Sequence, residues 1–174
     1  MVVYENLKLI KKIENAIVTV GAFDGFHKGH LAILNKMNSL SDNNKKKVVI
    51  SFDPHPKIIL KPKQKFELLI DKDKKIELYK KASIDILILC PFNEDFSKIS
   101  AKDFLKNIII DYLNPSYILI GYDHHFGFNR SGDFHFLKQS EKEYSYKTIR
   151  INPLSVNKNI LSSSLIRKLI TNGS

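Results

Sequence analysis

The chain has 174 residues, of which 43% are hydrophobic and 26% charged, a balance typical of one folded domain with a buried core. No apolar run approaches the roughly 18 residues that a membrane-spanning helix needs, and the first residues show no pattern of a secretory signal. The net charge of +10 attracts polyanions, yet only three of the 28 basic residues are arginines. Because proteins that read bases favour arginine, a nucleic-acid partner is not expected despite the charge.

Apolar segments of strand type alternate with helical patterns along the chain. The predicted strands are Ala16–Val20, Val48–Phe52, Ile84–Cys90, Tyr117–Ile120 and Tyr146–Ile151. The predicted helices are Gly29–Leu40, a helix from about Asp73, one from Ser100 to Leu113, Phe134–Glu143 and Ser162–Asn172. The basic stretch Lys57–Ile70 is expected to be irregular. This alternation predicts an α/β fold in which helices cover both faces of a parallel sheet.

The single cysteine, Cys90, lies in an apolar run and cannot form an internal disulfide. We interpret it as a core residue rather than a nucleophile. Its isolation fits a reducing compartment, so a cytoplasmic location is expected.

The residues able to carry chemistry collect in the loops that follow predicted strands. All six histidines and six of the seven glycines lie there, together with Arg130, and Arg167 begins the final helix. In a parallel sheet these loops meet at one edge, where ligands bind. We therefore expect imidazoles, flexible backbone and two guanidinium groups to gather in one place.

The most informative loop is Gly21–His30, in which a strand runs into a glycine-containing turn and then a helix. Free N–H groups at a helix start favour an anion, and glycines let the backbone approach it. His27 and His30 share one face of the helix start. They suit hydrogen bonds to phosphate oxygens better than a metal, for which we identify no further ligands.

Two short motifs then connect this loop to the end of the chain. His27-Lys28-Gly29-His30 matches the His-x-Gly-His signature of the α/β nucleotidyltransferases, and Ser162–Arg167 resembles their second signature, Ile-Ser-Ser-Thr-x-x-Arg. With Phe52–Pro56 and the segment from Gly121 to Asp133, these motifs resemble the FMN adenylyltransferase (FAD synthetase) module of bacterial bifunctional riboflavin kinase/FAD synthetases. The resemblance implies a Rossmann-like nucleotidyltransferase fold that transfers an adenylyl group from ATP to FMN, giving FAD and pyrophosphate.

The resemblance also implies roles for particular residues. His27, His30 and Arg167 would be the catalytic residues that contact the ATP phosphates. Other residues implied in ATP binding are Gly21, Phe23, Asp24, Gly25, Gly29, Gly121, Asp123, Ser163 and Ser164. Those implied on the FMN side are Phe52, Pro54, His55, Pro56, Phe126 and Arg130. Mg²⁺ is expected with ATP, and among protein ligands for it only Asp123 is a candidate.

Several interpretations stay open from the residues alone. Arg130 and Asp133 either form an ion pair that orders their loop or contact the ligand directly. Phe92 and Phe96 either line a flavin slot or pack in the core. Ala22 and Leu165 depart from the family pattern, which leaves a weakened or purely flavin-binding protein as an alternative.

Three further expectations concern the whole chain. A single adenylyltransferase domain over residues 1–174 is expected, without the riboflavin kinase domain and without kinase activity. ATP and FMN are the expected partners, no membrane partner is expected, and no oligomeric state follows from the sequence.

Two alternatives to the FMN adenylyltransferase function stay open. One is a nucleotidyltransferase of the same fold with another phosphate acceptor, such as nicotinate mononucleotide, phosphopantetheine or a glycerol phosphate. The other is a basic nucleic-acid-binding protein without catalysis.

Overall fold

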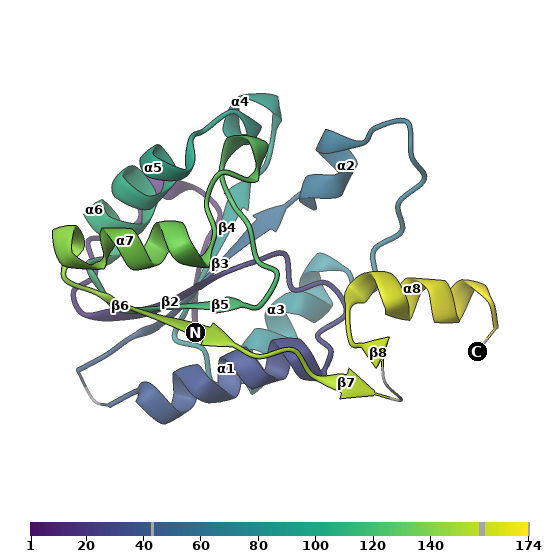
Figure 1. The fold of residues 1–174 in the computed structure, drawn as a ribbon, viewed down its shortest axis with the longest axis horizontal. Coiled ribbons are helices and arrows are strands. Elements are labelled where there is room, and N and C mark those ends of the chain that lie inside the picture. Colours follow the sequence, from purple (N-terminus) through teal and green to yellow (C-terminus); the bar gives the residue numbers. More distant parts are fainter. Residues whose placement is uncertain (43, 157–158, 174) are drawn as a thin grey trace.

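The fold is a parallel sheet between two layers of helices, described by a computed structural model for residues 1–42, 44–156 and 159–173 (Figure 1). Six strands pair side by side in the order β1-β4-β3-β2-β5-β6, all parallel. Their bounds are β1 Val2–Tyr4, β2 Ala16–Val20, β3 Lys47–Asp53, β4 Ile86–Pro91, β5 Pro115–Gly121 and β6 Lys147–Ile151. A small antiparallel pair follows, consisting of β7 Ser155–Val156 and β8 Asn159–Ile160. The expected α/β class is confirmed.

Helices fill most of the connections between strands. They are α1 Lys28–Leu40, α2 Pro56–Leu60, α3 Lys72–Lys81, α4 Glu94–Ser97, α5 Ala101–Phe104, α6 Asp111–Leu113, α7 Phe134–Tyr144 and α8 Ser163–Thr171. A π-helical segment, Leu105–Ile110, joins α5 to α6, and single 3₁₀ turns cover Leu7–Leu9 and Phe128–Arg130.

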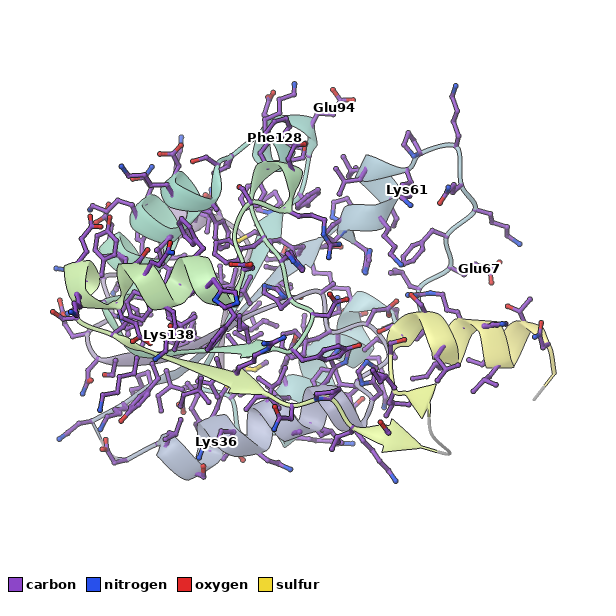
Figure 2. The ribbon with its side chains drawn as sticks, viewed as in Figure 1. Lys36, Lys61, Glu67, Glu94, Phe128 and Lys138 are labelled. Carbon is purple, nitrogen blue, oxygen red and sulfur yellow. The ribbon has the colours of Figure 1, made fainter. Side chains whose placement is uncertain are left out.

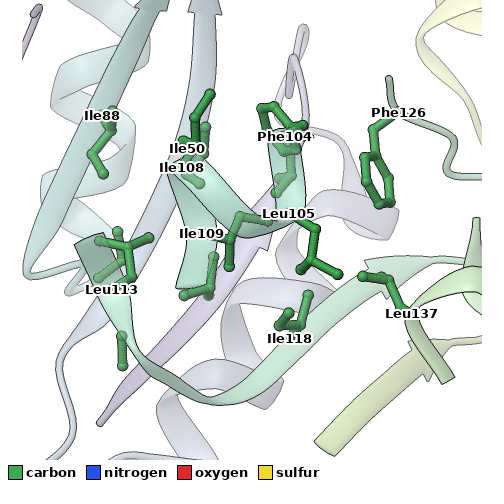
Figure 3. Packing of buried hydrophobic residues seen from close by; sticks show 14 of the residues in the cluster. Ile50, Ile88, Phe104, Leu105, Ile108, Ile109, Leu113, Ile118, Phe126 and Leu137 are labelled. Atoms are coloured by element: carbon green, nitrogen blue, oxygen red, sulfur yellow. The ribbon is translucent and has the colours of Figure 1, made fainter. Parts of the chain in front are cut away.

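The core divides into two layers because successive strand residues point to opposite faces of the sheet. Val48 and Ile50 face the layer of α5, the π-helical segment and α7, where Leu105 and Leu137 are buried (Figure 3). Val49, between them in β3, faces the opposite layer, formed by α1 and α3. Strands buried on both faces explain the continuous apolar runs in the sequence. Cys90 is fully buried in the first layer, as expected of a core residue.

Three local features differ from the sequence-based expectation. β1 was not predicted, because a three-residue edge strand shows too little periodicity. α2 lies inside the stretch expected to be irregular; it starts at Pro56, a residue suited to the first turn of a helix. The helix expected from Ser100 to Leu113 is widened at its centre into a π-helical segment.

The site is positioned by the edge of the sheet where β2 and β5 end. The chain leaves β2 toward β3 on one side, while β5 pairs with β2 on the other, so a crevice opens between their carboxyl ends. α8 lies beyond this edge, next to β7 and β8 (Figure 1). The last helix is thus brought to the loop that follows β2.

Candidate active site

The turn after β2 holds an unusual backbone conformation. Phe23, Gly25 and Phe26 have φ angles of 49°, 84° and 42°, in a region that costs a residue other than glycine about 1–2 kcal/mol. Packing offsets this cost, because the buried Phe26 ring contacts the Tyr79 ring edge-on with centroids 4.8 Å apart. At Gly25 a Cβ atom would come within 2.6 Å of Leu69 Cδ1. The turn therefore fixes the position of the residues that follow it.

The two histidines of the His-x-Gly-His motif form a stacked pair at the start of α1. His27 caps the helix by accepting a hydrogen bond from the His30 N–H through Nδ1, at 3.4 Å. The two rings lie 3.6 Å apart between centroids with an interplanar angle of 21°. The pair thus faces the space above the N-terminus of α1, where backbone N–H groups favour an anion.

Burial disfavours the charged form of both imidazoles. Burial lowers the pKa of His27, and burial together with the nearby His27 and Lys75 lowers the pKa of His30 to about 3. The Nδ1 atom of His30 is buried and has no hydrogen-bond partner among the residues that the structure describes. A buried polar atom without a partner is costly unless a ligand or water satisfies it. This atom therefore points to an occupant of the space around the pair.

The start of α8 is bound directly to the turn after β2. Ser162 caps the helix by accepting a hydrogen bond from the Leu165 N–H at 3.2 Å. Ser163 Oγ donates a hydrogen bond to the carbonyl oxygen of Asp24 at 2.6 Å. One turn later, Arg167 donates to the Asp24 carboxylate through Nη2. A second helix N-terminus therefore faces the same space as that of α1.

Asp24 organises this junction from a buried position. Its side chain is 1% exposed, and one carboxylate oxygen accepts the N–H groups of Leu69 and Ile70 at 3.0 and 3.3 Å. Arg167 is held a second time by its Nε–H, which donates to the carbonyl oxygen of Glu67 at 2.8 Å. Asp24 thus joins the turn, the 61–71 segment and α8 around one charge pair.

These elements enclose a cavity of about 330 Å³. The catalytic residues implied by the resemblance, His27, His30 and Arg167, all line it. Of the residues implied in ATP binding, those that line it are Gly21, Phe23, Asp24, Gly29, Gly121, Asp123, Ser163 and Ser164. Gly25 does not line it and packs against Leu69 instead. The fold therefore brings distant motifs of the sequence together at one place.

Most residues implied on the FMN side lie outside this cavity. His55 lines it, whereas Phe52, Pro54, Pro56, Phe126 and Arg130 do not. Phe126 is 9% exposed and packs between two rings of the first core layer, those of Phe104 and Phe136, at centroid distances of 5.6 and 5.9 Å.

The two phenylalanines with open roles, Phe92 and Phe96, pack against Phe52. Their ring centroids lie 5.5 and 6.0 Å from that of Phe52. The three rings thus form one aromatic cluster beyond the ends of β3 and β4, which agrees with the packing interpretation.

The ion pair considered for Arg130 and Asp133 is not formed. Asp133 caps α7, because its Oδ1 accepts the Phe136 N–H at 2.8 Å. Arg130 turns the other way, with φ of 57°, and its Nη2 lies 2.8 Å from His125 Nδ1 and 4.0 Å from Asp123 Oδ1. The structural interpretation as an Arg130–Asp133 pair was therefore wrong, and Arg130 orders the loop after β5 through other partners.

Several cavity residues were given no individual role by the sequence reasoning. Tyr122 and His124 belong to the loop after β5 that was singled out as a segment, whereas Lys57, Asn152, Leu154 and Leu161 were missed. The Nε2 atom of His124 is buried without a partner in the described part of the chain, and burial lowers its pKa to about 4. For Lys57 and Asn152 the available signal was their position after β3 and β6, since such loops converge at one edge.

Residues 1–42, 44–156 and 159–173 contain no group of three or more His, Cys, Asp or Glu side chains placed to hold a metal ion. Within the same ranges no helix is long and apolar enough to cross a membrane.

The parallel sheet and the cavity at its carboxyl edge define an α/β protein with a ligand site at the end of its strands. The chain belongs to the FAD synthetase family, whose model matches residues 9–165. It is 39% identical over 167 residues to the bifunctional riboflavin kinase/FMN adenylyltransferase of Buchnera aphidicola subsp. Schizaphis graminum, covering 95% of this chain and 53% of that protein. It is 30% identical over 159 residues to the FAD synthetase of Listeria monocytogenes, covering 91% and 64%. The chain thus spans between half and two thirds of the length of these relatives.

Solved structures show the same architecture. A structure titled macrolide-efflux protein from Streptococcus pneumoniae has a TM-score of 0.82 at 25% identity, covering 99% of this chain and 57% of that one. The pantoate-beta-alanine ligase of Francisella tularensis has a TM-score of 0.62 at 16% identity, covering 97% and 73%. The second likeness concerns the fold alone.

Proposed function

We propose that this chain transfers the adenylyl group of ATP to FMN, giving FAD and pyrophosphate. The observation that carries the proposal is the convergence of His27, His30 and Arg167 on one cavity between two helix N-termini. Family membership supports it, because the family model covers residues 9–165, nearly the whole chain. On this basis we propose that residues 1–174 act as one adenylyltransferase domain.

The chemistry needs positioning more than a reactive side chain. A phosphate oxygen of FMN attacks the α-phosphorus of ATP in line, and the bond from that phosphorus to the bridging oxygen breaks as pyrophosphate leaves. Charge builds up on the departing phosphates, so fixed hydrogen-bond donors lower the barrier. The stacked imidazoles of His27 and His30 would donate to oxygens near the α-phosphate. A neutral imidazole still carries one N–H that can donate, so burial, which lowers the pKa of both side chains, does not prevent this role.

The β- and γ-phosphates would lie at the start of α8. The hydroxyl of Ser164 and the N–H groups of the helix N-terminus suit an anion there. Arg167 has five N–H donors, of which Nε–H and one on Nη2 are engaged with Glu67 and Asp24. The remaining donors can bind phosphate while Arg167 keeps both anchors. The guanidinium is therefore fixed before pyrophosphate forms.

Mg²⁺ is proposed to enter with ATP. The carboxylate of Asp24 is occupied by its own partners, whereas the Asp123 side chain is 68% exposed at the cavity. Asp123 fits an ion that keeps several waters and phosphate ligands. When bound, Mg²⁺ would neutralise part of the negative charge on the phosphates. We also propose a cytoplasmic location, in which Cys90 stays a buried thiol.

The proposal is tested by incubating the purified protein with ATP, Mg²⁺ and one acceptor at a time and separating the products by chromatography. FMN is expected to give FAD and pyrophosphate in equal amounts. A product from nicotinate mononucleotide or phosphopantetheine, with none from FMN, would reject the proposed acceptor.

A further inference from the structure

One aromatic ring outside the predicted site gathers three basic side chains of the cavity. Phe66 lies in the 61–71 segment that links α2 to α3 and passes beside α8 (Figure 2). The guanidinium carbon of Arg167 is 4.2 Å from the centre of this ring, and Lys57 Nζ is 5.5 Å from it. The ring of His55 packs against it at a centroid distance of 4.5 Å. The start of α2 and α8 thus direct these side chains to one ring.

Lys57 sits where a phosphate chain would need a second cation. Its side chain lines the cavity, and its Nζ lies 3.5 Å from the hydroxyl of Ser164 at the start of α8. In the described ranges no carboxylate lies within ion-pair distance of Lys57. Burial and the neighbouring Arg167 lower the pKa of Lys57. The effect of Arg167 shows that the two positive charges repel each other, and an anion bound near both would remove that cost.

We propose that Lys57 is a further phosphate-binding residue and that Phe66 positions it beside Arg167. The ligand is the terminal phosphate pair of a nucleoside triphosphate, or the pyrophosphate that it becomes. This inference rests on the proposed function for the identity of the ligand. The face of an aromatic ring attracts cations, which restricts the positions of these two long side chains. Phe66 acts through those side chains and is therefore a positioning residue.

The test of Lys57 uses inorganic pyrophosphate as the probe and isothermal titration calorimetry as the measurement. Lys57→Gln is expected to weaken binding about tenfold, the effect of one hydrogen bond to a charged group. Lys57→Arg is expected to recover part of the loss. The matched control is Lys63→Gln, because Lys63 is an exposed lysine of the adjoining segment that does not line the cavity. Pyrophosphate affinity in Lys57→Gln equal to that of Lys63→Gln would overturn the proposal.

The test of Phe66 asks whether it works through the cations. Phe66→Leu is expected to raise the KM for ATP and the Kd for pyrophosphate about threefold to tenfold with little change in kcat. Phe66→Tyr, which keeps the ring, is expected to restore both values. In the double variant with Lys57→Gln, the effect of Phe66→Leu should shrink, because one of its two cations is gone. If the increase in the Kd for pyrophosphate in the double variant equals the product of the increases in the two single variants, the positioning role is rejected.

The outcomes separate this inference from the proposed function. Pyrophosphate binding is measured without FMN, so a wild-type protein that binds pyrophosphate through Lys57 but makes no FAD would contradict only the proposed acceptor chemistry. FAD formation that is unaffected by Lys57→Gln, together with unchanged pyrophosphate affinity, would overturn only the inference on Lys57. A wild-type protein that does not bind pyrophosphate at all would also overturn that inference.

Discussion

Arg167 and Asp24 are separated by 143 positions in the sequence, yet the guanidinium of one donates a hydrogen bond to the carboxylate of the other. This contact joins α8 to the turn after β2. No residue of α8 is fully buried, and Leu169 and Ile170 are exposed. Because apolar packing of this helix is sparse, we infer that polar contacts with Asp24 largely set its orientation toward the cavity.

The first prediction concerns the stability that Asp24 provides. Asp24→Ala removes the acceptor of two backbone N–H groups and leaves the half-buried Arg167 without its partner. The free energy of unfolding is expected to fall by about 3 kcal/mol, as for other broken buried pairs. Urea denaturation measures the change. Asp73→Ala, on the exposed first turn of α3, serves as the control, and equal stability of the two variants would contradict the organising role.

The second prediction concerns the phosphate donors. His30→Ala or Arg167→Ala is expected to lower the turnover of FAD formation by roughly 10²–10³, the effect of one fixed donor to developing charge. Steady-state kinetics with ATP and FMN provide the measurement. Lys46→Ala, in the exposed loop before β3, should keep wild-type turnover. If both site variants matched Lys46→Ala, the assignment of His30 and Arg167 would be refuted.

The third prediction concerns the pH dependence of stability. Burial lowers the pKa of His124 in the folded chain to about 4, against 6.5 for an ordinary histidine. Between these values the unfolded chain binds the extra proton and the folded chain does not, so stability rises with pH in this window. The contribution is complete above about pH 6.5 and is lost as the pH falls toward 4, with a slope of at most about 1.4 kcal/mol per pH unit.

His30 and His55, whose pKa values burial lowers to about 3 and about 4, act in the same direction. Replacing His124 alone by Gln should therefore reduce the slope of the unfolding free energy against pH, by the equivalent of about one bound proton, without abolishing it. Unfolding curves at several pH values provide the comparison, with His135→Gln as the control because His135 is exposed on α7. An unchanged slope in His124→Gln would show that this histidine titrates normally in the folded chain.

The fourth prediction concerns Gly127, which crosses over the start of α5. Its φ is +72°, and a Cβ atom there would lie 2.5 Å from Ala101 N and 2.6 Å from Ala101 Cα. Gly127→Ala is expected to destabilise the protein by more than the roughly 1–2 kcal/mol that the φ angle alone costs. Gly173 has a similar φ of +69° with nothing within 4 Å, so Gly173→Ala isolates the backbone effect. Similar melting temperatures for the two variants would rule out the close approach.

The sequence predicted the fold well where apolar periodicity was long. The five predicted strands and the main helices appear with small shifts at their ends. Buried parallel strands and amphipathic helices can be predicted because each shows a regular spacing of apolar residues within a short stretch of sequence. β1 and α2 escaped prediction, because three to five residues carry no such pattern. The π-helical segment Leu105–Ile110 buries Leu105, Ile108 and Ile109 in the core, and no local pattern in the sequence distinguishes it from an α-helix.

The candidate site was also predicted only in part. The histidine pair and Arg167 were predicted from motifs and do line one cavity, whereas Phe66 and Lys57 carry no motif. Their relation to Arg167 arises when the 61–71 segment folds back against α8, a contact between residues about 100 positions apart. An Arg130–Asp133 pair was one of two interpretations that the sequence left open, but Asp133 caps α7 instead.

The most direct test is a crystal structure of the protein with a non-hydrolysable ATP analogue and Mg²⁺. The account predicts that the phosphate chain lies between the N-termini of α1 and α8, within hydrogen-bond distance of His30 and Arg167. Phosphates bound away from both residues, in a protein that still makes FAD, would contradict it.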